Sequence, residues 1–280
     1  MIEQSEVIAF FDSRAGAWDR EMIRSDEKIA LILDNARVGK GSRVLDVACG
    51  TGVLIPDYLS RQAASVTAID ISPEMIRIAE SKFPEENIRF ICGDVETADV
   101  GRDFDAIVVY NAFPHFPDGA RLIQRLSSLL APGGRLTVAH GMSREDIDGH
   151  HRGSASRVSN GLMPVTELAG IFDRVLNVTA ILSDERMYQV VGEKSEKRHS
   201  HGEGFVHSHD HTGAHSHGDI PVAALLSHMA EHNRSHVSEL EELADHMEGA
   251  ARDAVLDAVF SMQDSADRLT EALNLYTCGL

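Results

Sequence analysis

The sequence predicts an α/β fold, with a doubly wound, mostly parallel sheet of seven strands and a small α-helical hairpin near the C-terminal end. After residue 42, short apolar runs alternate with amphipathic stretches, which is the pattern of βαβ units. A glycine-rich turn follows the first run. Only a short link joins the last two runs, so we expect the sheet to end in an antiparallel hairpin.

Seven apolar runs account for the strands of this sheet. Those expected to be parallel are Arg43–Val47, Ser65–Ile69, Ile88–Cys92, Asp105–Tyr110 and Arg135–Ala139. The two expected to be antiparallel are Val175–Leu182 and Met187–Val191. Each run is four to eight residues long and is rich in branched apolar side chains, as strands are.

Helices are predicted before and between these strands. Residues 1–42 are dense in polar side chains and are predicted to be helical. Apolar residues recur at helical spacing in Ser72–Phe83 and in Asp118–Leu130. The Ala-Pro-Gly-Gly segment at 131–134 ends the second of these helices. Another helix is predicted near Pro164–Phe172, before the last two strands.

Composition and charge exclude several classes of partner. The 280 residues include 26 Lys and Arg against 44 Asp and Glu, a net charge of −18. A chain this acidic is repelled by nucleic acid and by anionic membranes. No apolar run approaches the ~20 residues of a membrane span, and the first residues lack the pattern of a secretory signal. Three cysteines fit a reducing compartment, so we expect a cytoplasmic protein.

The chain is predicted to have three parts. Residues 1–192 form the α/β domain, and 193–219 are expected to be a disordered linker because His, Ser, Gly and Asp dominate them. Residues 218–280 carry twelve acidic and three basic residues, and 220–280 are predicted to form two helices hinged at Gly249. So small a hairpin is marginal alone, so we expect it to pack on the larger domain or to form a homodimer.

Each helix of this hairpin has a predicted apolar seam. In the first helix the seam includes two polar residues and consists of Val222, Leu226, Met229, Asn233, His236, Leu240, Leu243 and Met247. In the second helix it consists of Val255, Val259, Met262, Leu269 and Leu273. A polar residue within a seam costs stability unless it finds a partner.

Histidines are concentrated between residues 199 and 246, where 11 of the 15 lie. Within 199–217 they alternate at spacing two, and His228, His232 and His236 follow at spacing four on one helix face. Neutral imidazole is a good ligand for Zn, Ni or Co. Two interpretations remain open: a transition-metal site, and a solvated linker followed by a polar pair that fixes helix register.

The strongest functional motif is Val-Leu-Asp-Val-Ala-Cys-Gly-Thr-Gly at 44–52, where the first strand passes into a helix. Glycine allows a ligand to approach the backbone closely, and a helix N-terminus attracts an anion. A nicotinamide dinucleotide motif needs a third small residue where this chain has Ile55, so that pattern fails. Carboxylates stand at or just after three consecutive strand ends: Asp46, Asp70 and Asp94.

This segment resembles the first motif of class I S-adenosylmethionine-dependent methyltransferases, with Ala48 where that family often has glycine. The resemblance covers about residues 8–192 and is closest to the small-molecule branch that includes quinone-biosynthesis C-methyltransferases. It implies a Rossmann-like fold and a segment, 11–19, that closes over the cofactor. It also implies that S-adenosylmethionine is bound by Asp46, Ala48, Gly50, Gly52, Asp70, Ile71, Asp94, Val95 and Asn111.

Within that cofactor set, two acids have implied partners. Asp70 is expected to accept hydrogen bonds from the ribose hydroxyls, as the acid about 20 residues after the glycines does in dinucleotide folds. The resemblance implies that Asp94 contacts the adenine amino group.

Methyl transfer is an in-line displacement that requires positioning and, for some acceptors, a base. His115, in the loop after the fourth strand, is the first candidate for base or orienter, and His140 at the end of the fifth is the second. Local packing is the alternative for each. No feature selects the acceptor atom.

Three functions therefore remain open. The first is a methyltransferase of a small molecule with an appended metal-binding region. The second is a metal-binding or metal-delivery protein whose cofactor fold is not catalytic. The third is a methyltransferase that acts on a metal-chelating or tetrapyrrole substrate.

Overall fold

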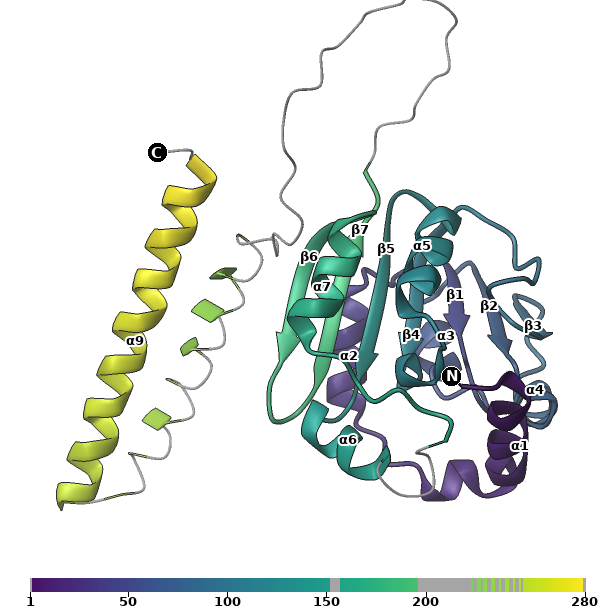
Figure 1. The fold of residues 1–280 in the computed structure, drawn as a ribbon, viewed down its shortest axis with the longest axis horizontal. Helices are drawn as coiled ribbons and strands as arrows, with labels where there is room; N and C mark the ends of the chain where they lie inside the picture. Colours follow the sequence, from purple (N-terminus) through teal and green to yellow (C-terminus); the bar gives the residue numbers. More distant parts are fainter. Residues whose placement is uncertain are drawn as a thin grey trace, which may run out of the picture.

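The computed structural model describes residues 2–151, 157–195 and 249–278, together with scattered positions between 223 and 247. Its core is a seven-stranded sheet in the order β3-β2-β1-β4-β5-β7-β6 (Figure 1). The first five strands run parallel, and β7 is antiparallel to both β5 and β6. The predicted class, with its antiparallel end, is confirmed. The strands are β1 Arg43–Val47, β2 Ser65–Asp70, β3 Ile88–Cys92, β4 Phe104–Tyr110, β5 Leu130–His140, β6 Asn177–Ser183 and β7 Tyr188–Glu193.

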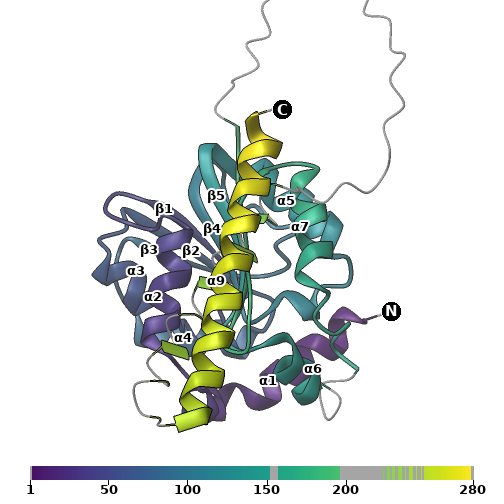
Figure 2. The same ribbon diagram turned by 90° about the vertical axis from the view of Figure 1, so that its left-hand side faces the viewer.

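Helices cover both faces of the sheet, as Figure 2 shows with α2 and α3 on one side and α5 and α7 on the other. Successive strand residues serve opposite faces: Val44 packs in the core beneath α2 and α3, and Leu45 packs in the core beneath α5 and α7. The helices of this part are α1 Gln4–Glu21, α2 Asp26–Asn35, α3 Ile55–Ser60, α4 Pro73–Lys82, α5 Gly119–Leu129, α6 Arg144–His151 and α7 Val165–Asp173.

Side-chain caps begin the two helices that the sequence predicted between strands. The Ser72 hydroxyl accepts a hydrogen bond from the Met75 amide at 3.1 Å at the start of α4. The Asp118 carboxylate accepts one from the Arg121 amide at 3.0 Å at the start of α5. Each cap satisfies an amide that has no partner within its own helix.

Strand β5 is longer than predicted. It begins at Leu130, directly after α5, so the segment 131–134 ends the helix but belongs to the strand. Leu130 pairs with Phe104, and a register shift then absorbs the extra residues before the regular ladder. Gly133 and Gly134 also exchange backbone hydrogen bonds with Lys194, each 2.9 Å long. Tertiary pairing therefore overrides the turn propensity of Pro and Gly here.

Helix α6 lies in the polar stretch after residue 140, where hydrophobic periodicity predicts no helix. The Ser143 hydroxyl accepts a hydrogen bond from the Asp146 amide at 3.1 Å and donates one to the Asp146 carboxylate at 2.9 Å. Ser followed three residues later by an acid is the sequence pattern of a capping box. That local signal was present, although the helix carries few apolar residues.

Helix α9 spans Gly249–Cys278, and the described positions from 223 to 244 are also helical. The Asn233 amide donates to the Ser265 hydroxyl at 3.1 Å, and Arg252 donates to the Ala244 carbonyl at 3.2 Å. Residues early in one helix thus meet residues late in the other, which makes the pair antiparallel. Gly249 has φ +66°, the left-handed conformation expected at the hinge.

Among the described positions of the first hairpin helix, Ala230, Val237 and Ala244, spaced by seven, are buried, whereas Met229 of the predicted seam is 45 % exposed. In α9, Val259 of the predicted seam and Ala266 are buried. Self-association of the hairpin stays a prediction, and none of the described helices is long and apolar enough to cross a membrane.

Candidate active site

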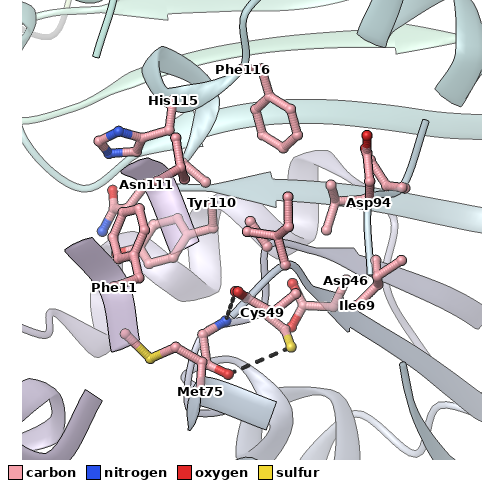
Figure 3. Close-up of a pocket in the computed structure, with 18 of the residues that line it drawn as sticks. Phe11, Asp46, Cys49, Ile69, Met75, Asp94, Tyr110, Asn111, His115 and Phe116 are labelled. Atoms are coloured by element: carbon pink, nitrogen blue, oxygen red, sulfur yellow. Dashed lines mark hydrogen bonds between the residues drawn. The ribbon is translucent and has the colours of Figure 1, made fainter. Parts of the chain in front are cut away.

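A cavity of about 420 Å³ lies at the carboxyl ends of β1, β2 and β4 (Figure 3). The strand order reverses between β1 and β4, which is where open α/β sheets bind ligands. The cavity is lined by 46–50, by the ends of β2 and β4 with the residues that follow them, by the loop after β3 and by one face of α1. Every residue of the predicted cofactor set except Gly52 lines this cavity.

The glycine-rich loop is held in its shape by Asp70. One carboxylate oxygen of Asp70 accepts the Gly50 amide and the other accepts the Ser72 amide, each at 2.8 Å. Gly50 and Gly52 have φ of +55° and +84°, a region that favours glycine. A Cβ on Gly52 would lie 2.7 Å from the Phe83 ring, so the loop packs closely on its surroundings.

Ala48 occupies the position where a glycine is frequent in the family that this segment resembles. Its φ is +55°, so the alanine adopts the left-handed conformation that costs an L-residue about 1–2 kcal/mol. The conformation that glycine would supply freely is therefore kept despite the substitution. Ala48 therefore has the backbone conformation that glycine favours, although it is not a glycine.

Asp46 ends its strand as a buried carboxyl, only 2 % exposed, at the wall of the cavity. Among the described residues its Oδ2 has no hydrogen-bond partner. Burial, followed by the charge of Asp70, raises the pKa of Asp46 to about 8. Burial also raises the pKa of Asp70, which its backbone hydrogen bonds partly offset.

Helix α1 is fastened to the loops after β2 and β3. The Gln4 amide donates to an oxygen of Asp94 at 3.0 Å, and the other oxygen accepts the Glu96 amide at 2.9 Å. The Asp12 carboxylate accepts the Ser72 hydroxyl, next to the residues that Asp70 holds. Two of the expected cofactor loops therefore have a partner on α1.

Asp19 fastens α1 to the glycine-rich loop as well. Its carboxylate accepts the Thr51 hydroxyl and forms a 2.7 Å ion pair with Lys82 of α4. These hydrogen bonds and the ion pair hold the pKa of Asp19 below its usual value although burial raises it. Phe11 and Trp18, on the same helix, line the cavity with rings 5.6 Å apart. The expectation that 11–19 covers the cofactor site agrees with this arrangement.

His115 lines the cavity from a short 3₁₀ turn, Phe113–His115. Its Nδ1 is 2.6 Å from the Val158 carbonyl oxygen, so Nδ1 carries a proton and donates it. In the neutral ring Nε2 is then the basic nitrogen. The Phe11 ring packs edge-on at 5.0 Å, and Asn160 donates its amide to the Phe116 carbonyl at 3.1 Å. Sequence reasoning missed Val158 and Asn160 because they are distant along the chain.

Asn111 and His140 have other surroundings than expected. Asn111 lines the cavity, but its Oδ1 accepts the Gly141 amide at 3.0 Å and so joins the ends of β4 and β5. His140 is 2 % exposed and packs against Tyr188 with the rings 6.0 Å apart. His140 is not among the described residues that line the cavity. Its catalytic interpretation therefore loses its geometric basis, because a strand-end side chain can point into the core.

The predicted metal ligands His228, His232 and His236 lie outside the described residues, as do 196–222, which make up most of the expected linker. Within the part of the chain that the structure describes, no three His, Cys, Asp or Glu side chains are grouped as metal ligands. The metal interpretation therefore stays a prediction from the sequence.

Comparison with known proteins agrees with this geometry. Residues 44–134 match the family described as a methyltransferase domain, and 222–276 match a domain of unknown function, DUF8180. A ubiquinone biosynthesis O-methyltransferase of Xylella fastidiosa (strain M23) is 37 % identical over 145 residues, 49 % of this chain and 58 % of the relative. One from Coxiella burnetii (strain RSA 493) is 39 % identical over 101 residues, 35 % of this chain and 42 % of the relative.

Solved structures share the fold. The N-methyltransferase NodS of Bradyrhizobium japonicum, bound to S-adenosyl-L-homocysteine, has a TM-score of 0.54 at 17 % identity over 68 % of this chain and 98 % of its own. A chain in a complex with the Haloferax volcanii methyltransferase activator Trm112 has a TM-score of 0.52 at 18 % identity, over 66 % of this chain and 97 % of its own.

The chain spans about half the length of the curated relatives it matches. Residues 44–134 match a methyltransferase domain, and the seven-stranded fold is shared with solved methyltransferases. Both findings agree with the resemblance stated for this segment. The relatives reported above carry the name of O-methyltransferases, whereas the resemblance was drawn to a branch that includes C-methyltransferases.

The raised pKa of Asp46 predicts a stability effect that needs no ligand. Between about pH 5 and 8 the carboxyl ionises in the unfolded chain, where aspartate titrates near 3.9, but stays protonated in the folded one. The contribution of protonated Asp46 to the free energy of unfolding is therefore fully present below about pH 4 and is lost as pH rises toward 8. Asp46→Asn removes this loss, so its stability relative to wild type should grow by about 1.4 kcal/mol per pH unit between pH 5 and 7 and by less toward pH 8.

Denaturant unfolding of both proteins at pH 5, 6, 7 and 8 measures this difference. Asp173→Asn, at an exposed position of α7, is the matched control and should follow the wild-type pH dependence. Parallel curves for wild type and Asp46→Asn would contradict the assignment of a buried, protonated Asp46.

Proposed function

We propose that this chain transfers a methyl group from S-adenosylmethionine to the hydroxyl group of a small, largely apolar acceptor. The observation that carries the proposal is that one cavity combines the Asp70-held glycine loop with His115. The names of the curated relatives support an oxygen as the acceptor atom.

The residues of the cavity fit this cofactor chemically. The unpartnered Oδ2 of buried Asp46 is an acceptor available to a cationic or hydrogen-donating group. Asp70 and Asp94 are carboxylates suited to ribose hydroxyls and to an exocyclic amine. Ile71 and Val95 give apolar walls for a planar base. We assign cofactor binding to these residues together with Ala48, Gly50, Gly52 and Asn111.

When bound, S-adenosylmethionine would supply an electrophilic methyl group on a sulfonium sulfur, with the uncharged thioether as the leaving group. Nε2 of His115 would take the proton that the acceptor hydroxyl loses. The Val158 carbonyl, which holds Nδ1–H, stabilises the resulting imidazolium. Phe11 and Trp18 on α1 exclude water from the reacting groups.

The acceptor is expected to be neutral rather than anionic. Aromatic and aliphatic side chains from α1 and the loop after β4 line this end of the cavity, among them Val7, Phe11 and Phe116. Asp46, Asp70 and Asp94 make the remaining wall acidic. The cation that lines it, Arg121, is paired with Glu96. A phosphate or carboxylate on the acceptor would meet repulsion here.

Replacement of Asp70 tests cofactor binding. Asp70→Ala removes the carboxylate that we assign to the ribose and that holds the Gly50 amide, so affinity for S-adenosylmethionine should fall roughly 10–150-fold, or ~1.5–3 kcal/mol. Trp18 is the only tryptophan of the chain and lines the cavity, so its fluorescence reports binding. Asp173→Ala is the exposed control. Unchanged affinity in Asp70→Ala, or tighter binding of NADH by wild type, would refute the assignment.

Replacement of His115 tests the base. His115→Gln keeps a hydrogen-bonding side chain but cannot accept the proton, so methyl transfer should fall by about 10²–10⁴-fold while cofactor binding persists. Radiolabelled S-adenosylmethionine and a panel of phenols and catechols measure transfer. His140→Gln is the matched control, because His140 does not line the described cavity, and it should retain transfer if folded. Equal transfer by wild type and His115→Gln would exclude this role.

The histidine pattern supports a second proposal, that 199–246 bind a transition metal such as Zn, Ni or Co beside the methyltransferase activity. Helical spacing pre-orders His228, His232 and His236, whereas ordering each linker residue costs ~1–2 kcal/mol. The helix should therefore hold the tighter site, and binding should weaken below about pH 6.5 as imidazole is protonated. The alternatives remain a metal-delivery protein without catalysis and a metal-chelating or tetrapyrrole acceptor.

Metal titration by calorimetry tests this ranking. A variant that lacks 199–217 should keep the tightest site, and the double variant His232→Ala, His236→Ala should lose it. The reverse result would place the site in the linker. No binding to wild type below millimolar metal would leave the solvated linker as the interpretation.

A further inference from the structure

The wall of the cavity carries one polar group that cofactor positioning alone does not explain. Asp46 is buried, and within the described part of the chain its Oδ2 has no hydrogen-bond partner. Buried polar atoms of folded proteins are nearly always satisfied. A carboxyl oxygen without a partner at the wall of a ligand cavity is therefore placed for a group that the ligand brings.

Among the described residues, the groups that act on this carboxyl include no positive charge. The groups described as acting on Asp46 are the Asp70 carboxylate at the end of β2 and, on α3, the Tyr58 hydroxyl and the Asp57 carboxylate. The buried Cys49 thiol on the glycine loop faces it as well. Asp57 is itself paired with Arg24 at 2.8 Å. The surroundings of Asp46 thus supply acids and neutral groups, which favour its protonated form.

We infer that Asp46 loses its proton when a cationic cofactor binds, so that the cavity favours S-adenosylmethionine over the uncharged thioether left after methyl transfer. The inference rests on the proposed cofactor. The carboxyl O–H bond breaks, the proton passes to solvent, and the carboxylate remains beside the ligand charge. Asp46 is then a specificity-determining residue that helps product to leave, because loss of the sulfonium charge removes part of what stabilises the carboxylate.

The sign of the pH dependence follows from the burial of this group. Without ligand the pKa of Asp46 is about 8, and an opposite charge within about 4–6 Å lowers a carboxyl pKa by 1–3 units. Binding of the cation must remove the proton below pH 8, so affinity rises with pH and levels off above about 8. The thioether lacks the sulfonium charge, so its affinity should rise less.

Binding titrations at pH 6, 7, 8 and 9 test the inference without any methyl acceptor. S-adenosylmethionine and S-adenosylhomocysteine are each titrated into wild type and Asp46→Asn, with Trp18 fluorescence as the readout. In wild type the affinity ratio of the two ligands should rise about tenfold from pH 6 to 8. In Asp46→Asn the rise should be absent. The amino group of each ligand titrates identically against both proteins, so the comparison isolates Asp46.

Calorimetry in two buffers of different ionisation enthalpy counts the proton. Wild type should release up to about one proton per S-adenosylmethionine near pH 7 beyond what Asp46→Asn releases. A second variant, Tyr58→Phe, removes a hydroxyl that lowers the pKa of Asp46, so the midpoint of the pH dependence should move to higher pH.

The outcomes separate this inference from the proposed function. If S-adenosylmethionine binds tightly but wild type and Asp46→Asn show the same ligand ratio at every pH, the inference fails and the proposed function stands. An unmoved midpoint in Tyr58→Phe also counts against it. If neither protein binds S-adenosylmethionine at any pH, the proposed function fails and the inference fails with it.

Discussion

The candidate site depends on the buried carboxylate of Asp70. Its two oxygens accept amides from Gly50 after β1 and from Ser72 after β2, so one side chain fixes two neighbouring loops at the sheet edge. Such charge-assisted bonds are stronger than neutral ones. Together with the hydrogen bond that the Cys49 amide donates to the Ile69 carbonyl at 3.0 Å, they tie the left-handed turn through Gly50 to β2. The shape of the proposed cofactor site therefore follows from a bond between elements that are adjacent in space rather than in sequence.

Helix α1 builds on the loops that Asp70 orders. Gln4, Asp12 and Asp19 each contact a different loop, namely those after β3, β2 and β1. Between these polar contacts, Phe11 and Trp18 turn an apolar surface toward the cavity. The cover is thus fastened to the same three loops that carry the proposed cofactor acids. A change in any one loop would be transmitted to the cover and to the His115 ring that Phe11 touches.

Burial and hydrogen bonding act in opposite directions on the pKa values of the acids Asp46 and Asp70. Burial makes ionised Asp46 unfavourable, while backbone amides partly compensate for the burial of Asp70. The folded protein therefore stores an unfavourable environment at Asp46 that a cationic ligand would relieve. A site that is destabilised without its ligand and complementary to it when bound is a common compromise between stability and function.

The sequence alone determined the strand order along the chain and the resemblance that predicted the cofactor residues, because hydrophobic periodicity and the motif at 44–52 are local signals. Tertiary structure decided what depends on distant partners. Strand pairing extends β5 through 131–134, where the sequence alone indicates a turn. The side chain of His140 is buried in the core and does not line the described cavity. The Val158 carbonyl selected the His115 tautomer across 43 residues. The structure also buries Ala230 and exposes Met229, although hydrophobicity by itself favours burial of the larger side chain.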